Sequence, residues 1–417
     1  MLFLLAVTCG VAVGNVYFPQ AGIAPVAAGF GVPPGTAALV VTAVQAGYAA
    51  GIFLLVPLGD RVPHRRLIVT LLVLTGLGLA AAAAAPGLGT LVAASAAIGV
   101  TTVVAPIAGP MAAGLVPAGR RGVVSGTLLS GSLGGMLLSR TAGGALGERL
   151  GWRVPYLVAA LLTLALAALL HRALPAHRRA SGDRPEPEPP RPRVVAAGRR
   201  YLALIIEPLR LLRAEPELRR SGLYQAAIFG GFSAAWTGLA LLLTGPPYRL
   251  GAQALGLLAL VNAVTMLCTP VAGRQVDRRG SDAVNLVTMT AVIVAAGVLL
   301  AGGAGGWAGL AALAAGTLLL DVAMQSGMVA NQVRIYALPV EIHARLNTAY
   351  MVCAYLGGAA GSWLAARAHA LAGWPAVCAL VALLAAAVLA VHLAVTRARR
   401  RGGAGGPVAA PKVAGIE

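Results

Sequence analysis

Long apolar runs, separated by short charged or turn-forming segments, recur along the whole of this 417-residue chain. Several of these runs approach or exceed the roughly 20 residues that a helix needs to cross a bilayer. Charged residues make up only 11% of the chain, and its mean hydropathy is +0.82. A soluble domain carries about a quarter charged residues, so this chain lacks the polar surface that soluble domains need. The sequence therefore predicts an all-α polytopic membrane protein surrounded by the lipid bilayer.

The formal net charge of +19 comes from short clusters of arginine that stand between the apolar runs. Membrane proteins concentrate positive charge in the loops on one side of the bilayer, so we expect no nucleic-acid partner. The N-terminus runs directly into an apolar stretch without a positively charged leader region. We therefore expect it to begin the first span and not a signal peptide.

Short motifs that would indicate an enzyme or a nucleotide-driven pump are missing from the sequence. It has no H-E-x-x-H, no G-x-S-x-G and no G-x-x-x-x-G-K-[ST] segment. The cysteines Cys9, Cys268, Cys353 and Cys378 are scattered through apolar segments without paired spacing, which indicates neither disulfides nor a metal site. We expect no enzymatic activity, no catalytic residues, no cofactor and no bound metal.

Twelve spans can be delimited where charges, prolines or glycines interrupt the apolar runs. They are residues 2–28, 35–58, 67–86, 88–116, 122–147, 153–172, 221–245, 252–274, 282–302, 306–335, 344–368 and 374–395. Alternate loops differ in charge. One set holds Arg61, Arg65, Arg66, Arg120, Arg121, Arg274, Arg278, Arg279, Arg345 and the arginines of 397–401, whereas the other set is nearly bare. The positive-inside bias predicts that both termini are cytoplasmic. The abundance of alanine, glycine and arginine is typical of GC-rich bacterial coding, so we expect the bacterial inner membrane.

A Pro-rich, charged stretch divides the chain between the sixth and seventh spans. We expect a six-helix half over 1–172, a cytoplasmic linker over 173–220, a second six-helix half over 221–396 and a cytoplasmic tail over 397–417. The linker segment 199–220 places leucine and isoleucine beside arginine at near-helical spacing. It is predicted to be either an amphipathic helix on the inner membrane face or a plain tether.

The two halves share landmarks in the same order, which indicates an internal repeat. In each half a Pro-containing basic loop is followed by LGG, at 133–135 and 356–358, and then by GW, at 151–152 and 373–374. A second similarity between the halves relates PLGDRVPHRR (57–66) to VAGRQVDRRG (271–280), each with an Asp-Arg pair at a predicted helix end. Parallel six-span halves are an architecture of secondary transporters.

With these features the chain resembles the major facilitator superfamily over essentially its whole length. The family signature between helices 2 and 3 is matched by Leu58, Asp60, Arg61, His64 and Arg65, although Val56 and Pro63 replace both of its glycines. Its second copy is matched by Gly273, Asp277, Arg278 and Gly280. The segments WTGLALLLTGPPYRLG and NQVRIYALPVEIHARLNTAYM resemble the drug/proton antiporter branch, among bacterial arabinose- and drug-efflux-like permeases. Two signatures depart from the family pattern: Ser95 replaces the helix 4 arginine, and SRTAGG (139–144) replaces G-P-x-x-G-G.

The Asp-Arg pairs are candidate gating residues, a role that the resemblance supports. Asp60, Arg61, Arg65, Asp277 and Arg278 stand at the cytoplasmic ends of spans 2 and 8 or at the start of the following span. They are predicted to hold the inner gate in one of two arrangements. The alternative is ordinary charged helix ends, each worth about 0–1 kcal/mol if exposed.

Asp321 and Arg140 are the charges that lie well inside predicted spans. A buried charge is costly in a membrane and usually faces a cavity or a partner, so both are candidate substrate or proton sites. Arg140 could instead snorkel to the interface, and Asp321 could simply pair with a neighbouring helix. Further candidates are the uncharged polar or aromatic residues Asn15, Tyr17, Gln20, Gln225, Trp236 and Gln325, because the resemblance implies that spans 1, 7 and 10 line the central cavity. Their alternative role is helix packing.

These observations predict a secondary active transporter that exports a small organic molecule by alternating access, coupled to protons, and that acts as a monomer. A cavity with amide, hydroxyl and aromatic groups and one acid suits neutral or cationic amphipathic molecules. A uniporter or a sugar or metabolite permease without proton coupling is the first alternative. A non-transporting receptor is the second.

The charge asymmetry of the loops gives a direct test of topology. A cysteine introduced by Pro185→Cys should be labelled by a membrane-impermeant maleimide only after the cytoplasmic membrane is permeabilised. Labelling at this position in intact cells would show that the linker lies outside and that the predicted orientation is wrong.

Overall fold

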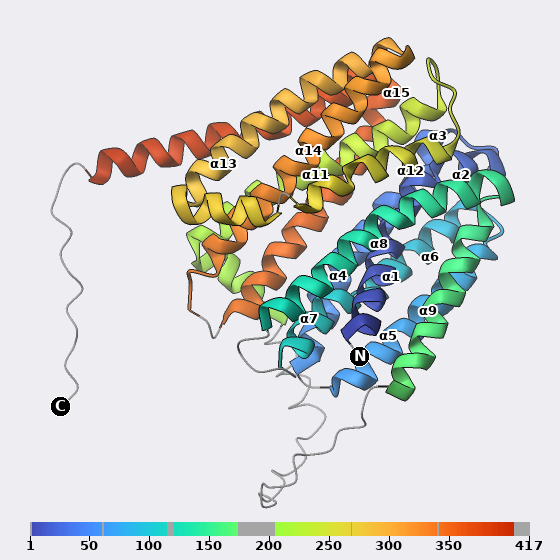
Figure 1. Ribbon diagram of the computed structural model, residues 1–417, viewed down its shortest axis with the longest axis horizontal. Coiled ribbons are helices and arrows are strands. Elements are labelled where there is room, and N and C mark those ends of the chain that lie inside the picture. The colour runs from blue at the N-terminus through green and yellow to red at the C-terminus, as the bar shows by residue number, and fades with distance from the viewer. Residues whose placement is uncertain are drawn as a thin grey trace, which may run out of the picture.

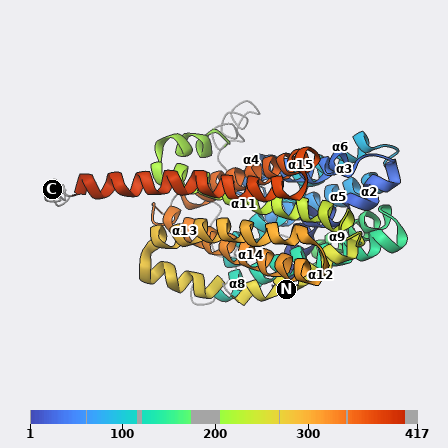
Figure 2. The ribbon, with the colours of Figure 1, turned by 90° about the horizontal axis from the view of Figure 1, so that it is seen from above.

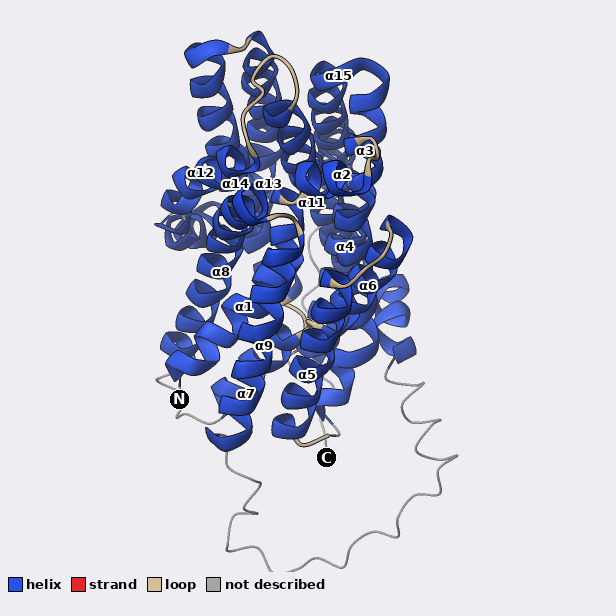
Figure 3. Ribbon diagram, turned by 90° about the vertical axis from the view of Figure 1, so that its right-hand side faces the viewer, coloured by secondary structure: helices blue, strands red, loops and turns tan. Residues whose placement is uncertain are grey.

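The computed structural model describes residues 2–60, 62–114, 121–173, 205–267, 269–339 and 342–403. All regular elements within these ranges are helical, as Figure 3 shows. Helices are the expected elements for a chain that spans lipid, because a helix satisfies its own backbone hydrogen bonds.

The first half contains six helical rods that follow the predicted spans. They are α1 (Leu2–Ala21) with α2 (Ile23–Phe30); α3 (Pro34–Ala37), α4 (Leu39–Leu55) and η1 (Val56–Asp60); α5 (His64–Ala83); α6 (Leu88–Thr101) with α7 (Val104–Gly114); α8 (Arg121–Leu150); and α9 (Arg153–Ala173).

The second half repeats this arrangement. Its rods are α11 (Pro216–Thr244); α12 (Ala252–Val261) with η3 (Asn262–Leu267) and the first part of α13 (Thr269–Ala301); the rest of α13 with η4 (Gly302–Ala304); α14 (Gly306–Ile335); and the two parts of α15 (His343–Gly403). Non-helical backbone at Gly280 divides α13, and non-helical backbone at Ala372 and Gly373 divides α15. The end of α15 projects past the bundle (Figure 2).

Nine helical segments of the described ranges are long and apolar enough to cross a membrane. One of them, His343–Arg399, is the broken α15 and holds two spans. The other two spans are α8, which carries Arg140, and the shorter apolar helix Ala252–Thr265. The predicted twelve-helix architecture of two related halves is therefore confirmed.

Two glycine-tryptophan pairs of the sequence repeat occupy equivalent turns in the structure. Gly151 has φ +90° and Gly373 has φ +67°, a left-handed conformation that glycine adopts without strain. Each is followed by a buried tryptophan, Trp152 and Trp374. The repeated motif thus reverses the chain between the last two spans of each half and anchors the returning helix in the core.

The break between α6 and α7 in the fourth span has its cause in Pro106. A proline in a helix removes one backbone donor and clashes with the carbonyl four residues before it, which here belongs to Thr102. The helix stops at that point, and the Thr102 carbonyl accepts from the Val104 N–H at 2.9 Å. The Thr102 hydroxyl donates to the carbonyl of Ala12 on α1 at 2.8 Å.

The two halves lie side by side with their rods roughly parallel, as the blue-to-green and yellow-to-red ribbons of Figure 1 show. α8 packs against α12, and α4 packs against α15. The Thr141 hydroxyl on α8 donates to the Gly256 carbonyl on α12 at 2.9 Å. The interface between the halves is therefore formed by helices that belong to different halves of the sequence.

Within the first half, α1 and α8 meet along a seam of glycines. A Cβ atom on Gly10 would lie 2.7 Å from the carbonyl oxygen of Gly131, and one on Gly135 would lie closer than 3.0 Å to the carbonyl oxygen of Gly10. Backbones this close gain van der Waals contact. Such packing drives helix association in lipid, where the hydrophobic effect between helices is absent.

The second half has the same seam between α11 and α15. Cβ atoms on Gly357 and Gly361 would collide with the backbone of Ala226 and Gly230. Each half therefore has its own close glycine contact between two helices.

Residues 205–214, in the segment predicted as linker, are helical. Ile206 and Leu209 are exposed, whereas Leu211 and Leu212 pack against a small core at the beginning of α15. Glu207 pairs with Arg345 at 2.5 Å. Of the two alternatives for this segment, a helix is present over these residues, and its position on the membrane face stays a prediction.

The glycine seam predicts unequal effects of two adjacent substitutions. Gly135→Ala should lower the free energy of unfolding by about 1–3 kcal/mol, because the added methyl group overlaps the backbone of α1. Gly134→Ala is the matched control, since a Cβ there has no heavy atom within 4 Å. Thermal unfolding of the detergent-purified proteins, followed by size-exclusion chromatography, measures the difference. Equal stability of the two variants would contradict the seam.

Candidate functional site

Asp321 and Arg140 lie within the bundle and are almost completely buried, with 1% and 0% of their surfaces exposed. Asp321 stands midway along α14, which belongs to the second half, and Arg140 stands on α8 of the first half. Arg140 does not snorkel to an interface, so that alternative is wrong.

Trp236 of α11 links the two charges. The Arg140 guanidinium carbon lies 4.2 Å from the centroid of the Trp236 ring, and the indole Nε1 donates to Asp321 Oδ1 at 3.3 Å. Arg140 and Asp321 make no direct ion pair among the contacts of the described residues. A cation over an aromatic face is attracted to the ring by about 0.5–2 kcal/mol, so Trp236 stabilises both charges.

Three more candidate or neighbouring residues complete this arrangement, which we call the central cluster: Arg140, Asp321, Trp236, Tyr17, Gln20 and Phe232. Gln20 Oε1 accepts a hydrogen bond from Arg140 Nε at 2.9 Å. The rings of Tyr17 and Phe232 lie 5.0 and 5.6 Å from the guanidinium carbon. Helices from both halves therefore surround one buried arginine.

Donor groups of the central cluster remain without acceptors in the described part of the chain. Arg140 Nη1 and Nη2 and the Gln20 amide nitrogen Nε2 are buried and have no hydrogen-bond partner. Buried polar groups in proteins are nearly always hydrogen-bonded, so this concentration of donors is unusual.

The face of α14 next to the central cluster is also polar. One turn after Asp321, the Gln325 amide donates to the Thr265 hydroxyl of η3 at 2.7 Å. Asn262, at the start of η3, lies beside the Asp321 carboxylate. The break of the eighth span into a 3-10 helix thus presents polar side chains to α14.

Two of the predicted residues lie elsewhere. Gln225 accepts a hydrogen bond from the Tyr350 hydroxyl at 2.9 Å, within the second half. Asn15 points away from the central cluster and donates to Thr163 of α9 at 3.4 Å. Both contacts are of the kind expected if Gln225 and Asn15 serve helix packing and do not bind substrate.

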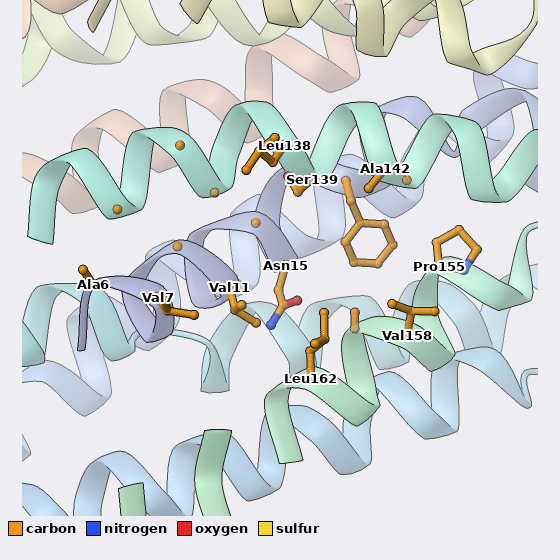
Figure 4. A pocket seen from close by; sticks show the side chains of 18 of the residues that line it. Ala6, Val7, Val11, Asn15, Leu138, Ser139, Ala142, Pro155, Val158 and Leu162 are labelled. Carbon is orange, nitrogen blue, oxygen red and sulfur yellow. The ribbon is translucent and has the colours of Figure 1, made fainter. Parts of the chain in front are cut away.

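Asn15 lines a groove of about 600 Å³ in the first half, between α1, α8 and α9. Figure 4 shows Asn15 and Ser139 among mostly apolar side chains such as Val11, Leu138 and Leu162. Neither Arg140 nor Asp321 lines this groove, so it is separate from the central cluster.

The interface between the halves holds a second set of polar contacts. Gln45 of α4 donates to Ser233 of α11 at 3.4 Å and accepts from Ser362 of α15 at 3.4 Å. The hydroxyls of Tyr17 and Tyr355 lie 3.4 Å apart. These long hydrogen bonds are weak, so they can be broken at low cost when the halves move.

The predicted gating residues stand at the end of the bundle that carries Arg65, Arg66, Arg274, Arg278, Arg279 and Arg345, which we call the arginine-rich end. Arg65 donates to the carbonyl of His171 and so ties the start of α5 to the end of α9. Asp277 and Arg278 are exposed. Arg61 and the side chain of Asp60 lie outside the described residues.

A charge network that the sequence analysis did not single out occupies the arginine-rich end of the second half. Asp282 Oδ1 accepts from Arg220 at 2.7 Å and from Arg334 at 2.5 Å, so it joins α13 to α11 and α14. Glu217 lies 3.5 Å from Arg334 and also contacts Arg399. The side chains of both Arg220 and Arg334 are only 7% exposed.

His392 extends this network onto α15. Its Nδ1 lies 3.1 Å from Arg220 Nη2 and 3.2 Å from the Tyr224 hydroxyl. A sequence signal was available: Arg220, Asp282 and Arg334 each fall at the same end of a predicted span. Charges at span ends are common, so this signal does not distinguish a network from separate solvated side chains.

The fold and the central cluster define a helical membrane protein of two six-helix halves with charged side chains buried where the halves meet. The chain matches the model of the Major Facilitator Superfamily over residues 2–335 and belongs to that family. It is therefore a membrane transporter by family, with a small-molecule substrate.

Bacterial relatives cover nearly all of the chain. The uncharacterized transporter YgaY of Escherichia coli O157:H7 is 32% identical over 381 residues, 91% of this chain and 91% of the relative. A relative named "Probable transporter SCO4007", of Streptomyces coelicolor, is 33% identical over 381 residues, 90% of this chain and 83% of the relative.

Solved structures share the fold at low identity. The human organic anion transporter MFSD10 (TETRAN) has a TM-score of 0.64 and 17% identity, over 94% of this chain and 98% of that one. The nucleoside transporter NupG has a TM-score of 0.68 and 10% identity, with the same coverage. At these identities the likeness concerns the fold alone.

The two aspartates near Gly280 are expected to behave differently when changed to asparagine. Asp282→Asn should lower the free energy of unfolding by about 1–3 kcal/mol, since two buried arginines lose their shared carboxylate. Asp277→Asn should leave stability unchanged, because Asp277 is exposed, and should slow turnover if it acts as a gate. Thermal unfolding together with transport assays separates the two effects. An Asp282→Asn protein as stable as the unmodified protein would show that the network does not hold the helices together.

Proposed function

We propose that the chain is a proton-coupled secondary active transporter whose coupling residue is Asp321. The observation that carries this proposal is the Arg140–Trp236–Asp321 arrangement, in which a buried arginine of one half contacts a buried carboxylate of the other only through an aromatic ring. Charges this deep in a bundle are expensive and are retained mainly where they serve function.

Alternating access requires the two halves to separate on one side and then on the other. Arg140 moves with the first half, whereas Trp236 and Asp321 move with the second. A change in their spacing alters the electrostatic environment of the Asp321 carboxylate, which makes its proton occupancy depend on the conformation. This linkage is what a proton-driven cycle needs.

For the cycle as a whole, we propose that residues 1–172 and 221–396 rock as two bodies in the bacterial inner membrane, with the linker 173–220, the tail 397–417 and both termini in the cytoplasm. Asp60, Arg61, Arg65, Asp277 and Arg278 are the proposed inner gate. Export is the proposed direction, by resemblance to the drug/proton antiporter branch. The charge of the substrate decides between antiport and symport. A cationic substrate competes with the proton for Asp321 and is exchanged for it, whereas an anionic substrate bound at Arg140 crosses together with the proton.

Transport without proton coupling, as in a uniporter or a metabolite permease, is the second candidate. The departure at Ser95, where the family signature has an arginine, favours it. A receptor that binds ligand without flux is the third alternative. Flux into proteoliposomes excludes the receptor, and dependence on a pH gradient separates the other two.

Asp321→Asn should abolish accumulation driven by a pH gradient while energy-independent exchange continues, because an amide cannot carry the proton. A resistance panel in an efflux-deficient host first identifies a substrate, and proteoliposomes with an imposed pH gradient then measure its accumulation. Glu148→Gln, which changes a carboxylate outside the central cluster, is the control. Full gradient-driven accumulation by Asp321→Asn would show that the carboxylate is structural.

A further inference from the structure

The unpartnered groups of the central cluster share one chemical character. Arg140 Nη1, Arg140 Nη2 and Gln20 Nε2 are all hydrogen-bond donors, and none has an acceptor among the described residues. The Gln20 oxygen accepts a hydrogen bond from Arg140 Nε at 2.9 Å, so the unpartnered atom of this amide is the donor nitrogen Nε2. A ligand that satisfies these groups must therefore offer acceptors.

A guanidinium with two free nitrogens matches an oxyanion in both charge and geometry. Arginine presents its donors as a planar fork that binds a carboxylate or phosphate through two parallel hydrogen bonds. Asp321 does not occupy this fork, since Arg140 Nη1 and Nη2 have no hydrogen-bond partner among the described residues and the carboxylate accepts from Trp236. Arg140 is thus a buried arginine whose two terminal nitrogens meet no acceptor in the described part of the chain.

The surroundings of the fork also define the rest of the ligand. The rings of Tyr17, Phe232 and Trp236 lie within 4.2–5.6 Å of the guanidinium carbon and come from both halves. In the proposed transport cycle, separation of the halves would move Phe232 and Trp236 of α11 away from Arg140 and open space for an apolar group between them. An aromatic or amphipathic body next to an oxyanion fits this site.

We propose that Arg140 and Gln20 bind the anionic group of the transported substrate, a carboxylate or other oxyanion, with its apolar part against Tyr17, Phe232 and Trp236. This inference rests on the proposed transport function and names its substrate class. It replaces the expectation of a neutral or cationic substrate, which followed from the composition of the cavity alone. Among the described residues Asp321 is the carboxylate next to this anion, so its protonation favours anion binding, and proton and anion cross together. An inward proton gradient drives such symport as uptake, so this inference also replaces the proposed direction of export.

Binding to the purified full-length protein, without any gradient, tests the substrate class separately from transport. The probes are three oxyanions, 2-naphthoate, benzoate and phenyl phosphate, each compared with its neutral amide or alcohol, and 2-naphthylmethylammonium as the matched cation. At least one oxyanion should bind about tenfold or more tightly than its neutral counterpart and than the cation, as expected for charge-assisted hydrogen bonds. If none does, the proposal is wrong.

Variants assign the binding to the named residues. Arg140→Gln should weaken binding of the preferred oxyanion at least about tenfold, and Arg140→Lys should be intermediate because it keeps the charge without the fork. Arg153→Gln is the matched control, since Arg153 also stacks on a tryptophan, at 4.4 Å from Trp152, but lies outside the cluster. Unchanged affinity in Arg140→Gln would overturn the proposal.

Two further variants keep the test valid if Arg140→Gln does not fold. Gln20→Ala removes one free donor and should weaken oxyanion binding about threefold. Asp321→Asn should tighten it several-fold, because the neighbouring negative charge is removed. If Asp321→Asn leaves the affinity unchanged or weakens it, proton and anion do not bind together. Oxyanion binding without gradient-driven flux would retain this site while rejecting the proposed transport cycle.

Discussion

The cost of burying charge in an apolar bundle governs the polar organisation of this protein. Arg140 and Asp321 are removed from water almost completely, yet they are not joined by a direct ion pair. Trp236 stabilises both, through its ring face on one side and its indole nitrogen on the other. Because the pair spans the interface between the halves, any motion of the halves changes its energy.

The remaining contacts divide into those within one half and those between the two halves. The glycine seams of α1 with α8 and of α11 with α15 lie within single halves, as does the Asp282 network. They hold each half together as a body. The contacts of Gln45, Tyr17 and Arg140 between the halves are long hydrogen bonds or ring contacts. Shorter hydrogen bonds between the halves, at 2.9 Å, join Thr141 to Gly256 and the Gln253 backbone N–H to Glu148, both between α8 and α12.

The twelve spans and the internal repeat could be predicted because both depend on local sequence. A bilayer sets the length of an apolar run, and a turn with positive φ selects glycine at Gly151 and Gly373. Asp321 and Arg140 could be selected because charges are rare inside spans. The sequence therefore determined the architecture and the two residues on which the proposed coupling depends.

Tertiary structure alone decided which side chains meet. A hydropathy pattern does not say which face of a membrane helix turns toward its neighbours, since nearly every face is apolar. Asn15 and Tyr17 are two residues apart on α1, and only Tyr17 reaches Arg140. Asp282, and not the motif residue Asp277, gathers the buried arginines, because Gly280 turns the chain between them. Helix rotation and long-range packing set these neighbours, and neither is encoded in the local order of residues.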